Sequence, residues 1–144
     1  MRKTARHKLG NLGEHWLATR LGLTLSSDPY DTEGDLFAQD GTRWEVKTQT
    51  RYSKLNVFSI RATKEINRKK CMTVAELIFV EYDKGDTIKA WRVTDRNSTV
   101  SYTTRSGLQM LGWPISRMQL LIEETDAELA AQMRALSTAA QFIV

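Results

Sequence analysis

Cysteine and histidine are scarce in this chain of 144 residues, which has one cysteine, Cys71, and two histidines, His7 and His15. A single cysteine cannot form a disulfide within the chain. One cysteine and two histidines also fall short of the four ligands that a structural zinc site takes. We therefore expect neither a disulfide framework nor a fold held together by zinc.

Long hydrophobic runs are missing as well. No stretch stays apolar over the roughly 20 residues that a membrane-spanning helix needs. The basic start of the chain is not followed by the apolar segment of a secretory signal. Internal repeats and low-complexity linkers are not found either. These absences predict a soluble, cytoplasmic protein with no membrane partner, and the length is that of a single domain.

Charge is unevenly distributed between the two halves. Residues 1–70 contain 14 Lys and Arg against 8 Asp and Glu, whereas residues 71–144 contain 7 against 9. The first half is therefore basic, and the whole chain has a net charge of +4. Basic clusters around an acidic site are what the phosphate backbone of a nucleic acid requires, which favours DNA as a partner.

The acidic site is predicted within residues 35–49. Leu36 and Ala38 alternate with polar or aromatic neighbours, and residues 43–49 alternate in the same way, so both segments have the period of two of a strand. The dipeptide Asp40-Gly41 between them is a strong signal for a hairpin turn.

Two turn geometries are open for this hairpin. A two-residue turn would place Asp35 opposite Val46 and send Glu45 to the other face. A three-residue loop over residues 39–41, with Gly41 left-handed, would place Asp35 opposite Glu45, with Cβ atoms about 5 Å apart. Lys47 would share their face. Facing carboxylates repel, and a hard divalent cation with oxygen ligands would offset that repulsion.

A third acid, Glu14, lies in a segment predicted to be a helix over residues 11–23. It falls on the same stripe as Leu17 and Leu21, beside Ala18, so its carboxylate would face inward and need a partner. The alternative is an ordinary acid in the first helical turn, stabilised by the helix dipole.

The order of these elements resembles the PD-(D/E)XK nuclease superfamily, which includes type II restriction enzymes, small Holliday junction resolvases and group I intron homing endonucleases. The resemblance covers residues 9–95. One departure is that no proline precedes Asp35; Gly34 stands there, as it does in many members. The matching motifs are Gly13-Glu14, Gly34-Asp35 and Glu45-Val46-Lys47.

The resemblance implies an α/β fold with a mixed α+β sheet in a restriction-endonuclease-like core, ordered helix-strand-strand-strand-helix-strand-strand, with extra C-terminal helices. It implies a single nuclease domain over residues 1–144, with a basic arm at 1–8, the core at 9–95 and a C-terminal extension at 96–144.

The implied activity is that of an endonuclease that hydrolyses DNA phosphodiester bonds with Mg²⁺ or Mn²⁺. Asp35, Glu45 and the Val46 carbonyl would bind the metal, and Glu14 would bind it directly or through water. Lys47 would orient the attacking water. Alternatives are a junction resolvase or nicking enzyme with the same chemistry, an RNA-directed nuclease, and a nucleic-acid-binding module without activity.

Basic and polar residues near these motifs are the candidate DNA contacts, although for Gln49 the sequence favours an ordinary polar strand residue over a phosphate contact. They are Arg2, Lys3, Arg6, Lys8, Gln49, Arg51, Lys54, Arg61, Lys64 and Arg68.

The remaining segments supply the scaffold. We expect a third strand of a meander at residues 56–60, a basic helix at 63–71, a central buried strand at 75–82, a strand at 87–93 and a short helix at 116–122. A capped helix starting near Asp126 carries Leu129, Met133, Leu136 and Ala140 at helical spacing. This stripe packs on the core or forms a subunit contact. Paired-strand cleavage and the apolar tail, including Trp113, predict a homodimer or a higher even-numbered oligomer.

Overall fold

The computed structural model describes residues 4–25 and 35–141, without the side chains of Asp35 and Gln141. This part of the chain is a mixed α+β protein. Its helices are α1 (Ala5–Leu21), α2 (Glu65–Thr73), the 3-10 turn η1 (Ile115–Arg117) and α3 (Ala127–Gln141). Its strands are β1 (Thr24–Leu25), β2 (Asp35–Phe37), β3 (Arg43–Gln49), β4 (Val57–Arg61), β5 (Glu76–Tyr82), β6 (Thr87–Val93), β7 (Val100–Thr103), β8 (Gln109–Pro114) and β9 (Met118–Thr125). None of the helices described is long and apolar enough to cross a bilayer.

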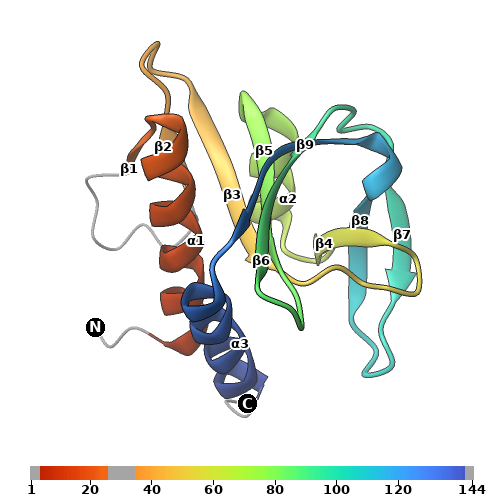
Figure 1. Ribbon diagram of the computed structural model, residues 1–144. Helices are drawn as coiled ribbons and strands as arrows, with labels where there is room; N and C mark the ends of the chain where they lie inside the picture. The colour runs from red at the N-terminus through yellow and green to blue at the C-terminus, as the bar shows by residue number, and fades with distance from the viewer. Residues whose placement is uncertain (1–3, 26–34, 142–144) are drawn as a thin grey trace.

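The strands form two sheets. The larger has the order β1-β2-β3-β5-β6-β9, and the smaller has the order β4-β8-β7. Strands β3 and β5 run parallel, while the other pairs in both sheets are antiparallel. The larger sheet is therefore mixed, as predicted. Helices α1 and α3 lie on one side of it, and the smaller sheet lies on the other (Figure 1).

Strand β5 is the centre of the core. Ile78 and Val80 belong to an apolar cluster with residues of α1 and α3, whereas Leu77 and Phe79 belong to a second cluster with residues of α2 and the smaller sheet. All four side chains have no exposed surface. A strand buried on both faces must be apolar throughout, which explains the run of apolar residues. The predicted central buried strand is confirmed.

Helix α1 begins at Ala5, where Thr4 caps it by accepting a hydrogen bond from the His7 amide at 3.2 Å. The helix therefore starts six residues earlier than predicted. Arg6 and Lys8 lie on its first two turns rather than on an arm that precedes it. Residues 1–3, which include Arg2 and Lys3, lie outside the described part of the chain.

The approach of α1 to the sheet depends on Gly13. A Cβ atom at this position would lie 1.8 Å from the Thr48 hydroxyl oxygen on β3. Real side chains do not come that close, so the hydrogen of glycine allows the helix backbone to lie against the strand.

The strand predicted at residues 56–60 forms as β4 but does not continue a meander. It pairs with β8 in the smaller sheet rather than with β3. Strand β3 already has neighbours on both sides, β2 and β5, so no position beside it is left for β4.

The helix predicted at residues 116–122 is wrong. Only η1 is helical there, and β9 follows it as an antiparallel partner of β6. Without β9, β6 would expose a row of unpaired backbone groups, and this long-range pairing outweighs the local tendency to form a helix. Residues 96–144 therefore add strands as well as one helix to the described fold, where the prediction was several helices.

The apolar stripe of α3 packs within the chain. Ala130 and Met133 have no exposed surface, and Leu129 and Leu136 pack against the same core cluster as α1. Trp113 is also fully buried, against Phe79 in the second cluster. The core interpretation of the stripe is confirmed, so a dimer would have to use other apolar surface.

Candidate active site at the β2–β3 hairpin

The hairpin adopts the three-residue geometry. Asp35 is the register partner of Glu45, and the Ala38 amide donates to the Thr42 carbonyl at 3.0 Å. Gly41 has a φ of 83°, the left-handed conformation that this loop requires. Hydrogen bonds from the Thr42 hydroxyl and amide lower the pKa of Asp40 and hold the turn closed. Of the two predicted registers, the one that pairs Asp35 with Glu45 is confirmed.

Glu45 is the most unusual residue of the hairpin because its carboxylate has no exposed surface. Two ammonium groups approach it. Lys47 Nζ lies 3.2 Å from Oε1, and Lys70 Nζ lies 3.5 Å from Oε2. Burial of a carboxylate is costly unless positive charge or hydrogen bonds compensate it. The two lysines provide that compensation.

Lys47 has a second contact that fixes its position. Its Nζ donates a hydrogen bond to the Asn67 Oδ1 at 2.8 Å, and its side chain is 18% exposed. Asn67 and Lys70 both come from α2, three residues apart, so they project from the same face of that helix. The helix thus brings one amide and one ammonium to the Glu45–Lys47 pair.

Prediction from the sequence did not place Asn67 or Lys70 at this site. Both residues fall in the predicted basic helix at residues 63–71, which was not expected to reach the acidic site. Their i, i+3 spacing on a helix that follows a Glu-x-Lys strand was the available signal.

The floor of the site is apolar. Glu45 and Lys47 are register partners of Leu77 and Phe79 on parallel β5, so all four side chains share the face that α2 covers. Cys71 of α2 is fully buried there, and burial raises the pKa of its thiol to about 12. The thiol is therefore neutral at ordinary pH. Charges on such a floor interact more strongly than they would in water.

Glu14 approaches β3 from the opposite side. It is 8% exposed on α1, and its neighbour Gly13 abuts Thr48, which follows Lys47. Of its predicted stripe, Leu17 is fully buried, whereas Leu21 at the helix end is 37% exposed. The inward position of Glu14 is confirmed. The Glu14 backbone lies beside the second half of β3. The first half, Arg43 to Glu45, is the part of the strand that pairs with β2.

The donor set of this hairpin suits a hard divalent cation. Carboxylates and backbone carbonyls are the ligands that Mg²⁺ prefers, and the register pairs Asp35 with Glu45 beside the Val46 carbonyl. Among the side chains that the structure describes, no three His, Cys, Asp or Glu residues gather as metal ligands. The Asp35 side chain lies outside that set.

Two of the residues that were predicted to contact DNA form hydrogen bonds or ion pairs within the chain instead. Both amide atoms of Gln49 bond to the Ser59 backbone, at 2.9 Å and 2.8 Å, and join β3 to β4. Arg51 forms a bidentate ion pair with buried Glu81, at 2.8 Å and 3.0 Å. These contacts favour the interpretation of Gln49 as an ordinary strand residue.

The remaining predicted DNA contacts in the described chain are more accessible. Arg61 is half-buried beside α2, while the others are exposed: Arg6, Lys8, Lys54, Lys64 and Arg68.

Comparison of the chain with known proteins gives no match among family models, curated proteins or solved structures.

Proposed function

We propose that this protein is a metal-dependent DNA endonuclease with a restriction-endonuclease-like core of the PD-(D/E)XK type. One observation carries the proposal. The Glu45 carboxylate is fully buried between Lys47 and Lys70, and Asp35 of β2 is the register partner of Glu45. A protein gains little stability from such a buried cluster, because apolar side chains would fill the space at lower cost. Buried charged clusters of this kind are instead frequent at catalytic sites.

The charge of the cluster suits a phosphate substrate. Lys47 and Lys70 lie within 3.5 Å of Glu45 and place two ammonium groups beside the acids that would hold the metal. These ammonium groups favour the approach of a phosphodiester, since they attract its negative charge. The exposed cations of α1 and α2 extend the same attraction along a nucleic acid strand.

Each residue has a distinct role in the proposed reaction. Asp35, Glu45 and the Val46 carbonyl would hold Mg²⁺, and Glu14, which approaches β3 from its other face, would bind it through water. When bound, the metal supplies an activated water and neutralises the phosphate oxygens. The Lys47 ammonium orients that water and stabilises the charge that develops on the phosphate. Asn67 keeps the ammonium in place through its hydrogen bond.

The test is incubation of the purified protein with supercoiled plasmid, linear duplex, four-way junction DNA and RNA, in Mg²⁺, Mn²⁺ or EDTA. We expect cleavage of DNA in either metal and none in EDTA. A Glu45→Gln variant should be inactive, and Glu123→Gln on β9, whose side chain is 56% exposed, serves as the matched control. Junction cleavage without duplex cleavage would identify a resolvase, and cleavage of RNA alone would identify an RNA-directed nuclease.

A non-catalytic nucleic-acid-binding module is the alternative from another class. It would bind the same DNA without cutting it in any metal, and Glu45→Gln would then behave as the wild type does. Cleavage that needs both a metal and Glu45 would exclude this alternative.

A further inference from the structure

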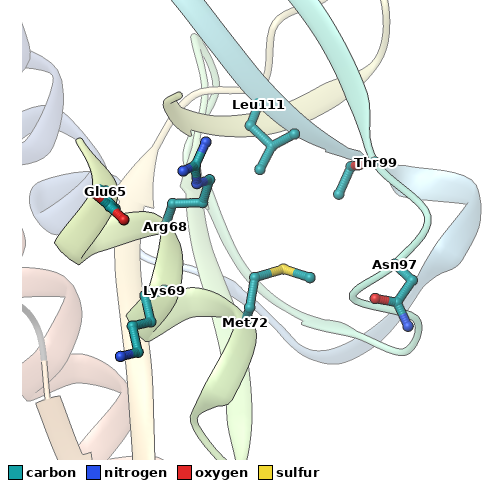
Figure 2. Close-up of a pocket in the computed structure, with 7 residues that line it drawn as sticks. All are labelled: Glu65, Arg68, Lys69, Met72, Asn97, Thr99 and Leu111. Carbon is teal, nitrogen blue, oxygen red and sulfur yellow. The ribbon is translucent and has the colours of Figure 1, made fainter. Parts of the chain in front are cut away.

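An open groove lies on the outer side of α2, away from the candidate active site. Its volume is about 390 Å³, within the range of about 300–1,000 Å³ that is usual for small-molecule sites. Residues of α2, of the segment after β6 and of β8 line it (Figure 2): Glu65, Arg68, Lys69, Met72, Asn97, Thr99 and Leu111.

The walls of this groove are fixed to each other. The Arg96 guanidinium donates hydrogen bonds to the carbonyls of Cys71, Val74 and Ala75 at the end of α2. Its own carbonyl accepts from the indole N–H of Trp113 at 3.0 Å. The turn that carries Asn97 is thereby tied both to α2 and to β8, so the groove is formed before any ligand arrives.

The turn itself is also closed by side-chain hydrogen bonds. Asp95 accepts from the Asn97 amide at 3.0 Å and from the Ser98 hydroxyl at 2.8 Å, and these contacts lower the pKa of its carboxyl. Asn97 and Thr99 remain exposed on this rigid turn, so their polar groups face solvent beside the groove.

The groove combines three kinds of chemistry. Arg68 and Lys69 are exposed cations on the α2 wall. Met72 and Leu111 are half-buried apolar side chains, and Figure 2 shows the Met72 thioether pointing from α2 towards the opposite wall. Asn97 adds an amide that can donate and accept. Cations, an apolar surface and an amide match the phosphate, the flat face and the polar edge of a nucleotide.

We propose that this groove binds one unpaired nucleotide of the DNA substrate, an inference that rests on the proposed function. Helix α2 presents Asn67 and Lys70 to Glu45 and Lys47 on one face, and Arg68 and Met72 to the groove on another. A helix is about 10 Å across, so the nucleotide lies roughly that far from the scissile phosphate. The preferred substrate is therefore DNA with an unpaired nucleotide beside the cleavage point.

Glu65 is the one acid among the groove residues. It stands in the first turn of α2, where the helix dipole stabilises a negative charge. Arg68 and Lys69 outnumber it on the same wall, so the groove still favours a phosphate group.

Binding without cleavage provides the test. Fluorescence anisotropy in EDTA should compare a blunt duplex with the same duplex carrying a three-nucleotide overhang. We expect the wild type to prefer the overhang by about tenfold, the scale of one hydrogen-bonded base. Asn97→Ala should reduce this preference severalfold and leave binding to the blunt duplex close to the wild type. Arg68→Ala should weaken binding to both duplexes, and binding to the overhang more, so that the preference also falls. Gln132→Ala on α3 and Lys84→Ala at the β5–β6 turn are exposed matched controls.

The outcomes separate the groove from the active site. If the wild type cuts plasmid DNA in Mg²⁺ yet binds both duplexes equally, the groove inference is overturned and the proposed function stands. An overhang preference that survives in both groove variants also overturns it. If the wild type neither binds nor cuts DNA, both proposals are overturned. Circular dichroism of the exposed Asn97 and Arg68 variants verifies that a lost preference does not come from unfolding.

Discussion

The Lys70 ammonium of α2 lies 3.5 Å from the Glu45 carboxylate of β3, which has no exposed surface. This pair joins the basic helix to the hairpin that carries the candidate catalytic acids.

Replacement of Lys70 by Met should destabilise the protein and make its free energy of unfolding depend on Mg²⁺. The change removes one of two cations that balance buried Glu45, at a cost of about 1–3 kcal/mol in the free energy of unfolding. A divalent cation would restore positive charge, so Mg²⁺ should recover part of the loss. Urea unfolding with and without Mg²⁺ measures both effects, with exposed Lys69→Met as the control. Equal losses for the two variants would contradict the role of Lys70.

Asp35→Asn and Glu45→Gln should each abolish Mg²⁺-dependent cleavage while DNA binding stays equal or becomes tighter. Each change removes a negative ligand beside a phosphate with little change of shape. Plasmid cleavage and anisotropy in EDTA measure the two properties separately. Cleavage near the wild-type rate by either variant would rule out the assigned site.

Lys47→Ala should lower the turnover number by about 10²-fold or more, the scale of one lost preorganised electrostatic group. Asn67→Ala should lower it less, because Lys47 stays present but loses its 2.8 Å hydrogen bond. Asn67→Asp keeps the acceptor and should retain more activity than Asn67→Ala. Single-turnover rates at saturating DNA measure these changes, and equal rates for the two Asn67 variants would show that the hydrogen bond does not position Lys47.

The Cys71 thiol should make stability depend on alkaline pH. Its pKa is about 12 in the folded protein and about 8.5 in an unfolded chain. Between these values the unfolded chain loses the proton and the folded protein keeps it, so stability falls as pH rises from about 8.5. Relative to Cys71→Ala, the wild type should lose about 2 kcal/mol by pH 10. Urea unfolding of both proteins from pH 7.5 to 10 tests this, and a constant difference between them would refute it.

The protein should form a homodimer. One active centre cuts one strand, and two centres related by symmetry would match the near two-fold symmetry of a duplex or junction. Strand β9 is the open edge of the larger sheet in the described chain, and its Leu120 is 39% exposed. Light scattering over a concentration series should give twice the 16.5 kDa of one chain. A mass that stays at one chain, with and without DNA, would leave a monomeric nickase.

The parts of the site that the sequence predicts are those set by neighbouring residues. The alternation around Asp40-Gly41 and the left-handed Gly41 define the hairpin locally, and so they bring Asp35 opposite Glu45. The contribution of Asn67 and Lys70 depends on how α2 packs over the parallel β3–β5 pair. That packing joins segments distant in the chain. The i, i+3 spacing of Asn67 and Lys70 indicates that they share a face of the helix, but not which strand that face meets.

The same difference between local and distant contacts explains where the prediction of the fold was wrong. Residues 118–125 form a strand, and the predicted strand at residues 57–61 pairs outside the expected meander, because distant partners, β6 and β8, offer unpaired backbone groups to them. The helix or strand propensity of a segment does not depend on whether such a partner exists elsewhere in the chain. By contrast, β5 was predicted correctly because a strand that is buried on both faces consists mostly of apolar residues, and this composition is visible in the sequence.

The contact between Gly13 and Thr48 limits how this chain can change over evolutionary time. Any larger residue at position 13 forces α1 away from β3, and Glu14 moves with the helix because it is the next residue. A single mutation there affects packing and the candidate acid together. The contact between Gly13 and Thr48 does not involve the side chain of Glu14. A change of the candidate acid can therefore keep this contact, whereas a change of the glycine cannot.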